Sequence, residues 1–345
     1  MINAPSIKAI AKHPREKSKL VRIHGGAEPS MGLIFSLIWA TTIATFYILI
    51  PWESMSGRPK FADLDNYVNA INLIASAQEI INSNGLVWLF SEPGWTLIML
   101  LIGLFAQEPL EALQLISWLC AIAFLWFMHR RAGAALSLII MFNPLVLDLV
   151  FSQVRSATAL ALLLIALVST NRLIRLLLVI YACTVHSVSF ILISLYFISV
   201  ALEYSTTLRT RLYKGIFCIV ISLILAWTLS YGREDLFTAI GDRRADYDID
   251  SGSVLFVSFW MFCAMAIIAA RKFFFKDAWH WSEGTVVMLF SLAFFMTLFS
   301  TNGVRFISLG LPLFACVLNS ARPSTKTVTT FLLISYQAIQ FVYWY

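Results

Sequence analysis

Three basic side chains set in apolar sequence are the strongest candidates for chemistry. Arg155 stands where one apolar run gives way to the next, Arg305 lies between two apolar runs with almost no loop, and His186 interrupts a long apolar stretch. A guanidinium group binds phosphate oxygens through paired hydrogen bonds, and a histidine accepts a proton near neutral pH. Together they suit a site for an anionic, lipid-linked substrate.

Each of the three also has an ordinary structural explanation. Arg155 can extend to the lipid headgroups or pair with Asp148, two helical turns earlier, and Arg305 can anchor a tight turn at the membrane surface. A histidine in an apolar helix is commonly a packed, hydrogen-bonded residue. The functional interpretation therefore depends on all three lying at one level, near the outer surface.

The composition predicts the environment that must position these residues. Of 345 residues, 59% are apolar and 13% are charged, whereas soluble domains have about 45–50% and about 25%. This excludes a soluble domain and a disordered chain, and it predicts an all-α polytopic membrane protein, because helices satisfy their own backbone hydrogen bonds in lipid. The net charge of +6 is then a signal of membrane orientation and not of nucleic-acid binding.

A crossing helix needs roughly 20 apolar residues. Residues 86–106 are interrupted by Ser91-Glu92-Pro93-Gly94, so we expect a re-entrant segment there, and the apolar stretch 173–202 is expected to cross twice with a break near His186. The sequence thus predicts about eleven transmembrane helices and a re-entrant segment in a single membrane domain, residues 1–345. The other expected spans are 31–51, 109–128, 132–150, 156–170, 215–231, 253–270, 284–300, 303–320 and 326–345.

The distribution of charge supports this arrangement. It places 18 of the 25 Lys and Arg residues in the cytoplasm, including the basic tail of residues 1–30, and seven outside. If residues 86–106 crossed the membrane, 11 would lie inside and 14 outside, against the cytoplasmic preference of Lys and Arg. We therefore expect a cytoplasmic N-terminus and an outer C-terminus.

Two outer segments are long enough to be ordered. Residues 52–108 contain the re-entrant segment and an amphipathic stretch, 66–84, which is expected to lie on the membrane surface as a helix. Residues 232–252 form the second outer loop. Its three alternating aspartates, from Asp246 to Asp250, lack the glycine and glutamate of a calcium loop and are typical of a solvated acidic loop.

Short motifs in a fixed order make the sequence similar to a known family. They resemble the EpsG family, which comprises Wzy-like polymerases of bacterial surface polysaccharides, and the resemblance covers roughly residues 60 to 320. Where the family has Arg-Gln, this chain has Arg155-Ser156, which keeps the arginine and not the glutamine. The motifs are Asp65-x-Tyr67, Glu92-Pro93-Gly94-Trp95, Val154-Arg155, Val185-His186-Ser187 and Val304-Arg305-Phe306.

The resemblance implies a metal-independent membrane glycosyltransferase with a GT-C-like fold and no cofactor. It would be an O-antigen or capsule polymerase of the bacterial inner membrane, with its site facing the periplasm. It would transfer an undecaprenyl-pyrophosphate-linked oligosaccharide onto the non-reducing-end sugar of another lipid-linked repeat unit. Membrane lipids and a chain-length regulator protein are the further partners that it implies, with no nucleic acid among them.

The resemblance also implies roles for single residues. His186 would remove the proton from the acceptor hydroxyl, and Arg155 and Arg305 would stabilise the leaving pyrophosphate. Glu92 would either orient sugar hydroxyls or cap the helix that begins at Pro93. The substrate-binding candidates are Arg243, Arg244, Glu92, Asp65 and Tyr67.

Three other functions stay open. A ligase would transfer finished glycan to a lipid A core, and a transporter would move lipid-linked glycan across the membrane, although transporters usually have internal repeats or paired broken helices. A glycosyltransferase with polyprenyl-monophosphate donors would hold a metal ion on Asp63 and Asp65.

Overall fold

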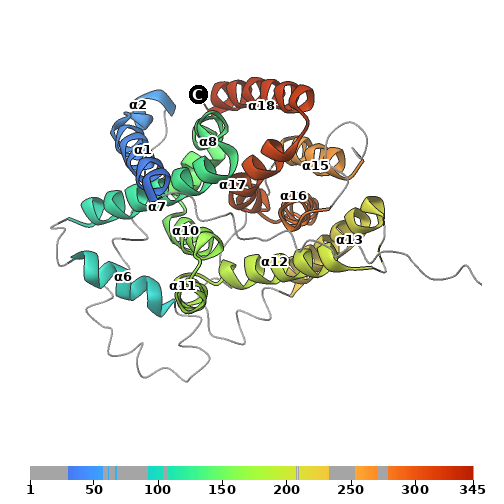
Figure 1. The fold of residues 1–345 in the computed structure, drawn as a ribbon, viewed down its shortest axis with the longest axis horizontal. Coiled ribbons are helices and arrows are strands. Elements are labelled where there is room, and N and C mark those ends of the chain that lie inside the picture. The colour runs from blue at the N-terminus through green and yellow to red at the C-terminus, as the bar shows by residue number, and fades with distance from the viewer. Residues whose placement is uncertain are drawn as a thin grey trace, which may run out of the picture.

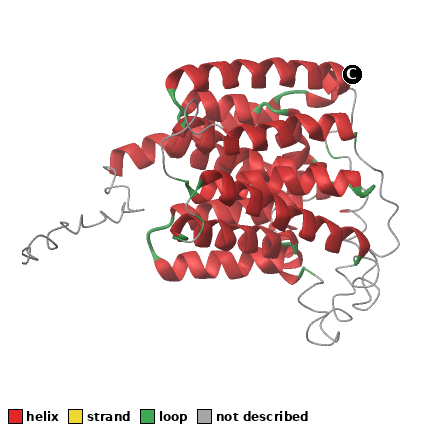
Figure 2. Ribbon diagram, turned by 90° about the vertical axis from the view of Figure 1, so that its right-hand side faces the viewer, coloured by secondary structure: helices red, strands yellow, loops and turns green. Residues whose placement is uncertain are grey.

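The computed structural model describes residues 30–56, 61, 67, 92–103, 108–206, 208, 210–232, 253–269 and 279–344. Their regular secondary structure is helical, and none of these residues lies in a strand (Figures 1 and 2). The predicted all-α class is therefore confirmed for the described part of the chain. The tail of residues 1–29, the segment 66–84 apart from Tyr67, and the second outer loop beyond Gly232 lie outside the described residues.

Most helices lie roughly parallel to one direction, as in a bundle (Figure 2). They are α1 (Ser30–Leu49), α2 (Trp52–Ser56), α6 (Pro93–Gly103), α7 (Pro109–Ala132), α8 (Ala134–Met141), α9 (Pro144–Phe151), α10 (Val154–Val168), α11 (Arg172–Val185), α12 (Val188–Tyr204), α13 (Arg211–Tyr231), α15 (Val254–Ala269), α16 (Trp281–Leu298), α17 (Val304–Ser320) and α18 (Pro323–Trp344).

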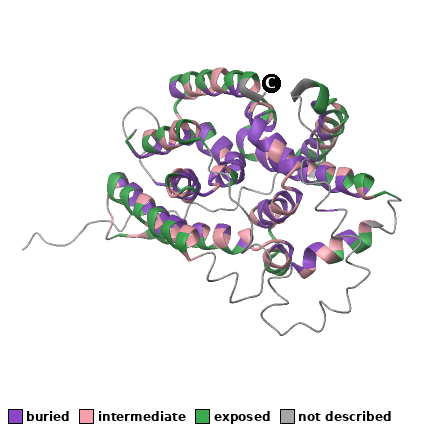
Figure 3. Ribbon diagram, turned by 180° about the vertical axis from the view of Figure 1, so that it is seen from behind, coloured by how far each residue is buried: buried purple, intermediate pink, exposed green. Residues whose placement is uncertain are grey.

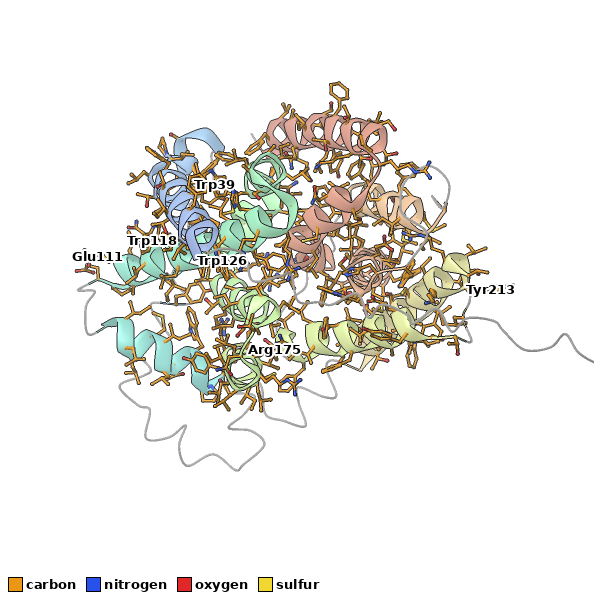
Figure 4. The ribbon with its side chains drawn as sticks, viewed as in Figure 1. Trp39, Glu111, Trp118, Trp126, Arg175 and Tyr213 are labelled. Atoms are coloured by element: carbon orange, nitrogen blue, oxygen red, sulfur yellow. The ribbon has the colours of Figure 1, made fainter. Side chains whose placement is uncertain are left out.

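Helix α16 lies inside the bundle, where it packs against α12, α13, α15 and α17. Its residues from Val286 to Leu292 are all buried, as expected for a helix that is apolar all round. Helix α7 is the second packing centre and contacts α1, α8, α10 and α17. Tryptophans line its contact with α1, where Trp118 Nε1 donates to Thr45 Oγ1 (3.1 Å) near Trp39 and Trp126 (Figure 4).

The outer faces of the peripheral helices are exposed (Figure 3), and many of the exposed residues are large and apolar. Phe35 and Phe46 on α1 are 64% and 65% exposed, and Leu255 on α15 is 84% exposed. A soluble protein rarely exposes apolar surface on this scale, whereas lipid chains supply an apolar environment for it. The outer surface is that of a membrane protein.

Four helices are long and apolar enough to cross a bilayer, namely α1, α7, α13 and α16. The pair α8 and α9 passes the same test together but is bent by 71°, which makes it a broken span or a re-entrant loop. Helices α6, α10, α12, α15 and α17 are apolar but shorter. The described residues therefore contain four or five candidate spans by length and composition, and the count of about eleven stays a prediction.

Two helix breaks decide how the apolar stretches fold. The stretch 173–202 divides between α11 and α12 at His186-Ser187, as predicted. The expected span 132–150 is wrong as a continuous helix, because Asn143 and Pro144 end α8 and begin α9. Asn143 Oδ1 accepts from Leu145 N (2.9 Å), and proline fits the first helical position because it has no N–H to satisfy.

Basic side chains gather at one end of the bundle. Lys214 Nζ donates to the Glu203 carbonyl oxygen (3.1 Å), and Arg211 Nη2 lies 2.9 Å from Glu283 Oε2. Burial lowers the pKa of the His280 imidazole below its ordinary value, although the nearby Glu203 carboxylate acts in the opposite sense. These contacts join α12, α13 and α16 at this end.

The basic end, defined by Arg131, Arg211, Lys214 and Lys326, is continued by Asn319. Its Nδ2 donates to the Arg131 carbonyl oxygen (2.9 Å) and its Oδ1 accepts from Lys326 Nζ (2.7 Å), which joins α7, α17 and α18. Helix α12 connects the basic end to the other end of the bundle, because it begins just after His186 and ends just after Glu203. The basic end and the candidate site therefore lie at opposite ends.

Candidate active site

Glu92 lies between Arg155 and His186. Arg155 Nη1 is 2.6 Å from Glu92 Oε2, and His186 Nδ1 is hydrogen-bonded to Glu92 Oε1. Glu92 is 5% exposed, and the two contacts join residues that are 63 and 94 positions apart in the sequence. These three residues form the Glu92 cluster.

A separate helix end positions each member of the Glu92 cluster. Arg155 lies in the first turn of α10, His186 follows the last residue of α11, and Glu92 immediately precedes α6. The backbone of His186 is extended, with φ −158° and ψ 136°, so the chain leaves α11 there and turns into α12. The helix ends meet here because α11 packs against both α6 and α10.

The backbone of Glu92 is strained. Its φ is +59°, in the left-handed region that a residue with a side chain seldom adopts. Such a conformation costs about 1–3 kcal/mol and persists when its surroundings hold it in place. Here the ion pair with Arg155 and the hydrogen bond with His186 hold the Glu92 side chain, and the start of α6 holds its backbone.

Gly94 fixes the start of α6 against α11. Tyr181 Oη donates to the Gly94 carbonyl oxygen (3.2 Å), and Thr184 lies directly over the Gly94 Cα. A Cβ at position 94 would lie 2.3 Å from Thr184 Oγ1 and 2.9 Å from the Thr184 carbonyl carbon. Only glycine permits this approach, which brings Glu92 within reach of His186.

Replacing Gly94 with alanine is expected to lower the stability of the protein by about 1–3 kcal/mol, because the added methyl group pushes α6 off α11. The measurement is the melting temperature of the purified protein in detergent. Gly32→Ala is the matched control, since a Cβ at position 32 meets nothing within 4 Å and should leave stability unchanged or raise it. Equal melting temperatures for the two variants would contradict the close approach.

The ring of Tyr67 lies against the guanidinium group of Arg155. Its hydroxyl donates to the Ser152 carbonyl oxygen (3.2 Å), and its ring centroid lies 5.8 Å from Arg155 Cζ and 5.7 Å from the ring of Trp95. Tyr67 and Trp95 are both buried. The structure therefore brings Tyr67, a predicted substrate-binding residue, against Arg155.

The alternative pairing of Arg155 with Asp148 is not present. Asp148 Oδ2 accepts from Gln153 Nε2 (2.6 Å), while the guanidinium of Arg155 points to Glu92. The sequence suggested that Glu92 orients sugar hydroxyls or caps the helix that begins at Pro93. Its side chain pairs with Arg155 and His186, and neither suggested role includes these two contacts.

Arg305 lies apart from the Glu92 cluster. It is exposed in the first turn of α17, and α17 contacts α9 and α10. The preceding turn is held tightly, because Thr301 Oγ1 donates to the Met296 carbonyl oxygen (2.7 Å) and a Cβ on Gly303 would lie 2.2 Å from the Ala293 carbonyl oxygen. The structure gives no contact between Arg305 and the cluster, and Asp65, Arg243 and Arg244 lie outside the described residues.

The Glu92 cluster can accept a proton. An ionised carboxylate only accepts hydrogen bonds, so Glu92 requires the proton of a neutral His186 to lie on Nδ1. The other ring nitrogen, Nε2, then carries a free lone pair. Arg155 balances the charge of Glu92, so the cluster is neutral before it accepts a proton and carries one positive charge afterwards.

Within the described residues, no group of three or more His, Cys, Asp or Glu side chains is placed to hold a metal ion. Asp63 and Asp65 lie outside them. Residues that the sequence did not single out for the site are Tyr181, Thr184 and Gln153, since a tyrosine, a threonine and a glutamine at helix ends carry no pattern of their own.

Comparison with known proteins gives one match. The model of the EpsG family matches residues 41–345, which is most of the chain and includes every member of the Glu92 cluster. No curated protein and no solved structure matches the chain.

Proposed function

The chain belongs to the EpsG family, and from this premise we propose that it is a membrane glycosyltransferase that polymerises the repeat units of a bacterial surface polysaccharide. The donor is an undecaprenyl-pyrophosphate-linked oligosaccharide, and the acceptor is the non-reducing-end sugar of a second lipid-linked repeat unit. The observation that carries the proposal is the pairing of Glu92 with both Arg155 and His186.

The reaction needs a base and a stabilised leaving group. His186 Nε2 takes the proton of the acceptor hydroxyl while the hydroxyl oxygen forms a bond to the anomeric carbon of the donor. The bond from that carbon to the pyrophosphate oxygen breaks, and its electron pair stays on the pyrophosphate. The products are the elongated lipid-linked glycan, undecaprenyl pyrophosphate and a proton held on His186.

Electrostatics favour this transfer. Glu92 orients the imidazole and stabilises the imidazolium that forms, which is the role of the carboxylate in carboxylate–histidine pairs. The cluster gains one positive charge at the moment when negative charge develops on the leaving pyrophosphate. Arg155 has guanidinium donors besides those that face Glu92 and Tyr67, and we propose that these bind the pyrophosphate.

The orientation that we propose follows from the two ends of the bundle. The basic end lies in the cytoplasm, because Lys and Arg are enriched there, and the Glu92 cluster faces the periplasm of the inner membrane. Eleven crossings are made by α1, α7, the pair α8–α9, α10, α11, α12, α13, α15, α16, α17 and α18. Helix α6 enters and leaves on the outer face, since its 11 residues extend only about 16 Å.

Arg305→Gln is expected to reduce the elongation rate about 10- to 100-fold, because a cation that binds the leaving pyrophosphate is removed. The measurement is the elongation of lipid-linked repeat units by the purified protein. Arg322→Gln is the matched control, since Arg322 is likewise exposed but lies in the connection from α17 to α18, at the basic end. Equal rates for both variants would remove Arg305 from the site.

The glycan profile of a deletion strain tests the function itself. A polymerase predicts surface glycan with single repeat units, restored to long chains by the intact gene. An unchanged ladder of long chains would overturn the proposal. A ligase predicts long chains that stay unattached, and a transporter predicts that purified protein elongates nothing.

A further inference from the structure

A second polar pair lies beside the Glu92 cluster, at the break between α9 and α10. Ser152 and Gln153 separate the two helices, and Gln153 Nε2 donates to Asp148 Oδ2, in the last turn of α9, at 2.6 Å. The backbone N–H groups of Ser152 and Gln153 both donate to the Asp148 carbonyl oxygen (2.8 and 3.1 Å). The Gln153 amide therefore holds the Asp148 carboxylate, and the two backbone bonds hold the turn that brings the two residues together.

The pair has acceptor capacity that the described protein does not use. Gln153 Oε1 is buried without a hydrogen-bond partner in the described structure. Turning the amide round would not help, because Oε1 would then face the Asp148 carboxylate, which only accepts. Asp148 is half-buried, and its Oδ1 likewise has no partner among the described residues. A buried acceptor without a donor is unfavourable by about 1–3 kcal/mol, so the site favours a ligand that brings O–H groups.

Tyr67 places this pair next to the reacting groups. The Tyr67 hydroxyl binds the carbonyl oxygen of Ser152, the residue before Gln153, while the ring of Tyr67 lies against the Arg155 guanidinium. The width of one tyrosine ring thus separates the α9–α10 break from the Glu92 cluster. A glycan of more than one sugar ring that presents a hydroxyl to His186 can extend past Arg155 toward this break.

We propose that Asp148 and Gln153 form a subsite that binds hydroxyl groups of a sugar ring in the acceptor glycan. The inference rests on the proposed function for the identity of the glycan. Asp148 Oδ1 accepts a hydrogen bond from one hydroxyl, and Gln153 Oε1 accepts from a second when its side chain turns toward the sugar. Gln153 also holds Asp148 in place in the free protein. The pair sets the affinity for the acceptor and takes no part in the proton transfer.

The test separates binding from chemistry. The full chain is placed in lipid nanodiscs with the lipid-linked repeat unit extracted from the deletion strain, and elongation is measured over a range of acceptor concentrations. Asp148→Asn and Gln153→Leu are each expected to raise the half-saturating acceptor concentration about tenfold. The first variant loses the charged acceptor of a sugar hydroxyl, and the second loses the amide that positions this acceptor. The maximal rate should stay within about twofold of the unchanged protein. Gln337→Leu is the matched control, since this buried glutamine donates to the Ile139 carbonyl oxygen on α8.

A lower maximal rate with an unchanged half-saturating concentration in both variants overturns the subsite and leaves the polymerase intact. If the unchanged protein elongates nothing, the proposed function fails, and binding decides the subsite alone. Saturation-transfer NMR then uses methyl glycosides of the common hexoses as probes. Signals that the unchanged protein gives and both variants lose support the subsite, whereas signals retained by both variants, or absent from the unchanged protein, overturn it.

Discussion

Replacing His186 with asparagine is expected to lower the elongation rate by about 10²- to 10⁴-fold, the range for loss of a general base. The amide group of the introduced asparagine would still donate to Glu92 Oε1, as His186 Nδ1 does, but it offers no nitrogen that accepts a proton. The fold should therefore survive while the chemistry is lost. The measurements are the elongation rate and the melting temperature of the same preparation.

The half-saturating acceptor concentration separates this outcome from a structural one. It should change by less than about threefold, because a base acts in the transition state and contributes little to binding. His129→Asn is the control, since His129 lies at the basic end, stacked on Trp39 with ring centroids 4.5 Å apart. A His186→Asn protein that retains more than about a tenth of the rate would show that another group accepts the proton.

Much of the fold could be predicted because it follows from local sequence. Hydropathy places the helices, and the polar residue His186 in the stretch 173–202 marks the break between α11 and α12. The break between α8 and α9 had a local signal as well, Asn143-Pro144, which a count of apolar residues passes over. Helix number is harder, because helices of 14 to 17 residues such as α10, α11 and α12 fall below the length that marks a span.

The members of the Glu92 cluster could be singled out from the sequence, but the contacts among them could not. Arg155, His186 and Glu92 each stand out as a polar residue at a break in apolar sequence. Hydropathy gives the depth of such a residue but not the direction in which its helix faces. The pairing of Glu92 depends on the close approach of Gly94 on α6 to Thr184 on α11. These helices are far apart in the sequence, and no local pattern encodes the approach. The contact between Tyr67 and Arg155 likewise has no local signal, and the role of Tyr67 in substrate binding stays a prediction.

Replacing Glu92 with glutamine is expected to lower the elongation rate by about 10²- to 10⁴-fold, comparable to the loss of the base itself. A glutamine side chain has one acceptor oxygen, whereas the two oxygens of Glu92 accept from two donors, Arg155 Nη1 and His186 Nδ1. If the oxygen stays with Arg155, the amide NH₂ group faces His186 Nδ1. The imidazole must then accept there and carry its proton on Nε2, so the lone pair that serves as the base is lost.

The ¹⁵N spectrum of labelled His186 distinguishes this mechanism from a general loss of structure. The unchanged protein should have its neutral imidazole protonated on Nδ1, and the Glu92→Gln protein should have it protonated on Nε2. The left-handed backbone at position 92 strains glutamate and glutamine alike, so the substitution adds no new backbone penalty. Glu108→Gln is the control, since Glu108 is exposed just before α7. If the rate falls while the proton stays on Nδ1, Glu92 acts through the charge that it places beside the imidazolium and not through the tautomer. An unchanged rate would remove Glu92 from the mechanism altogether.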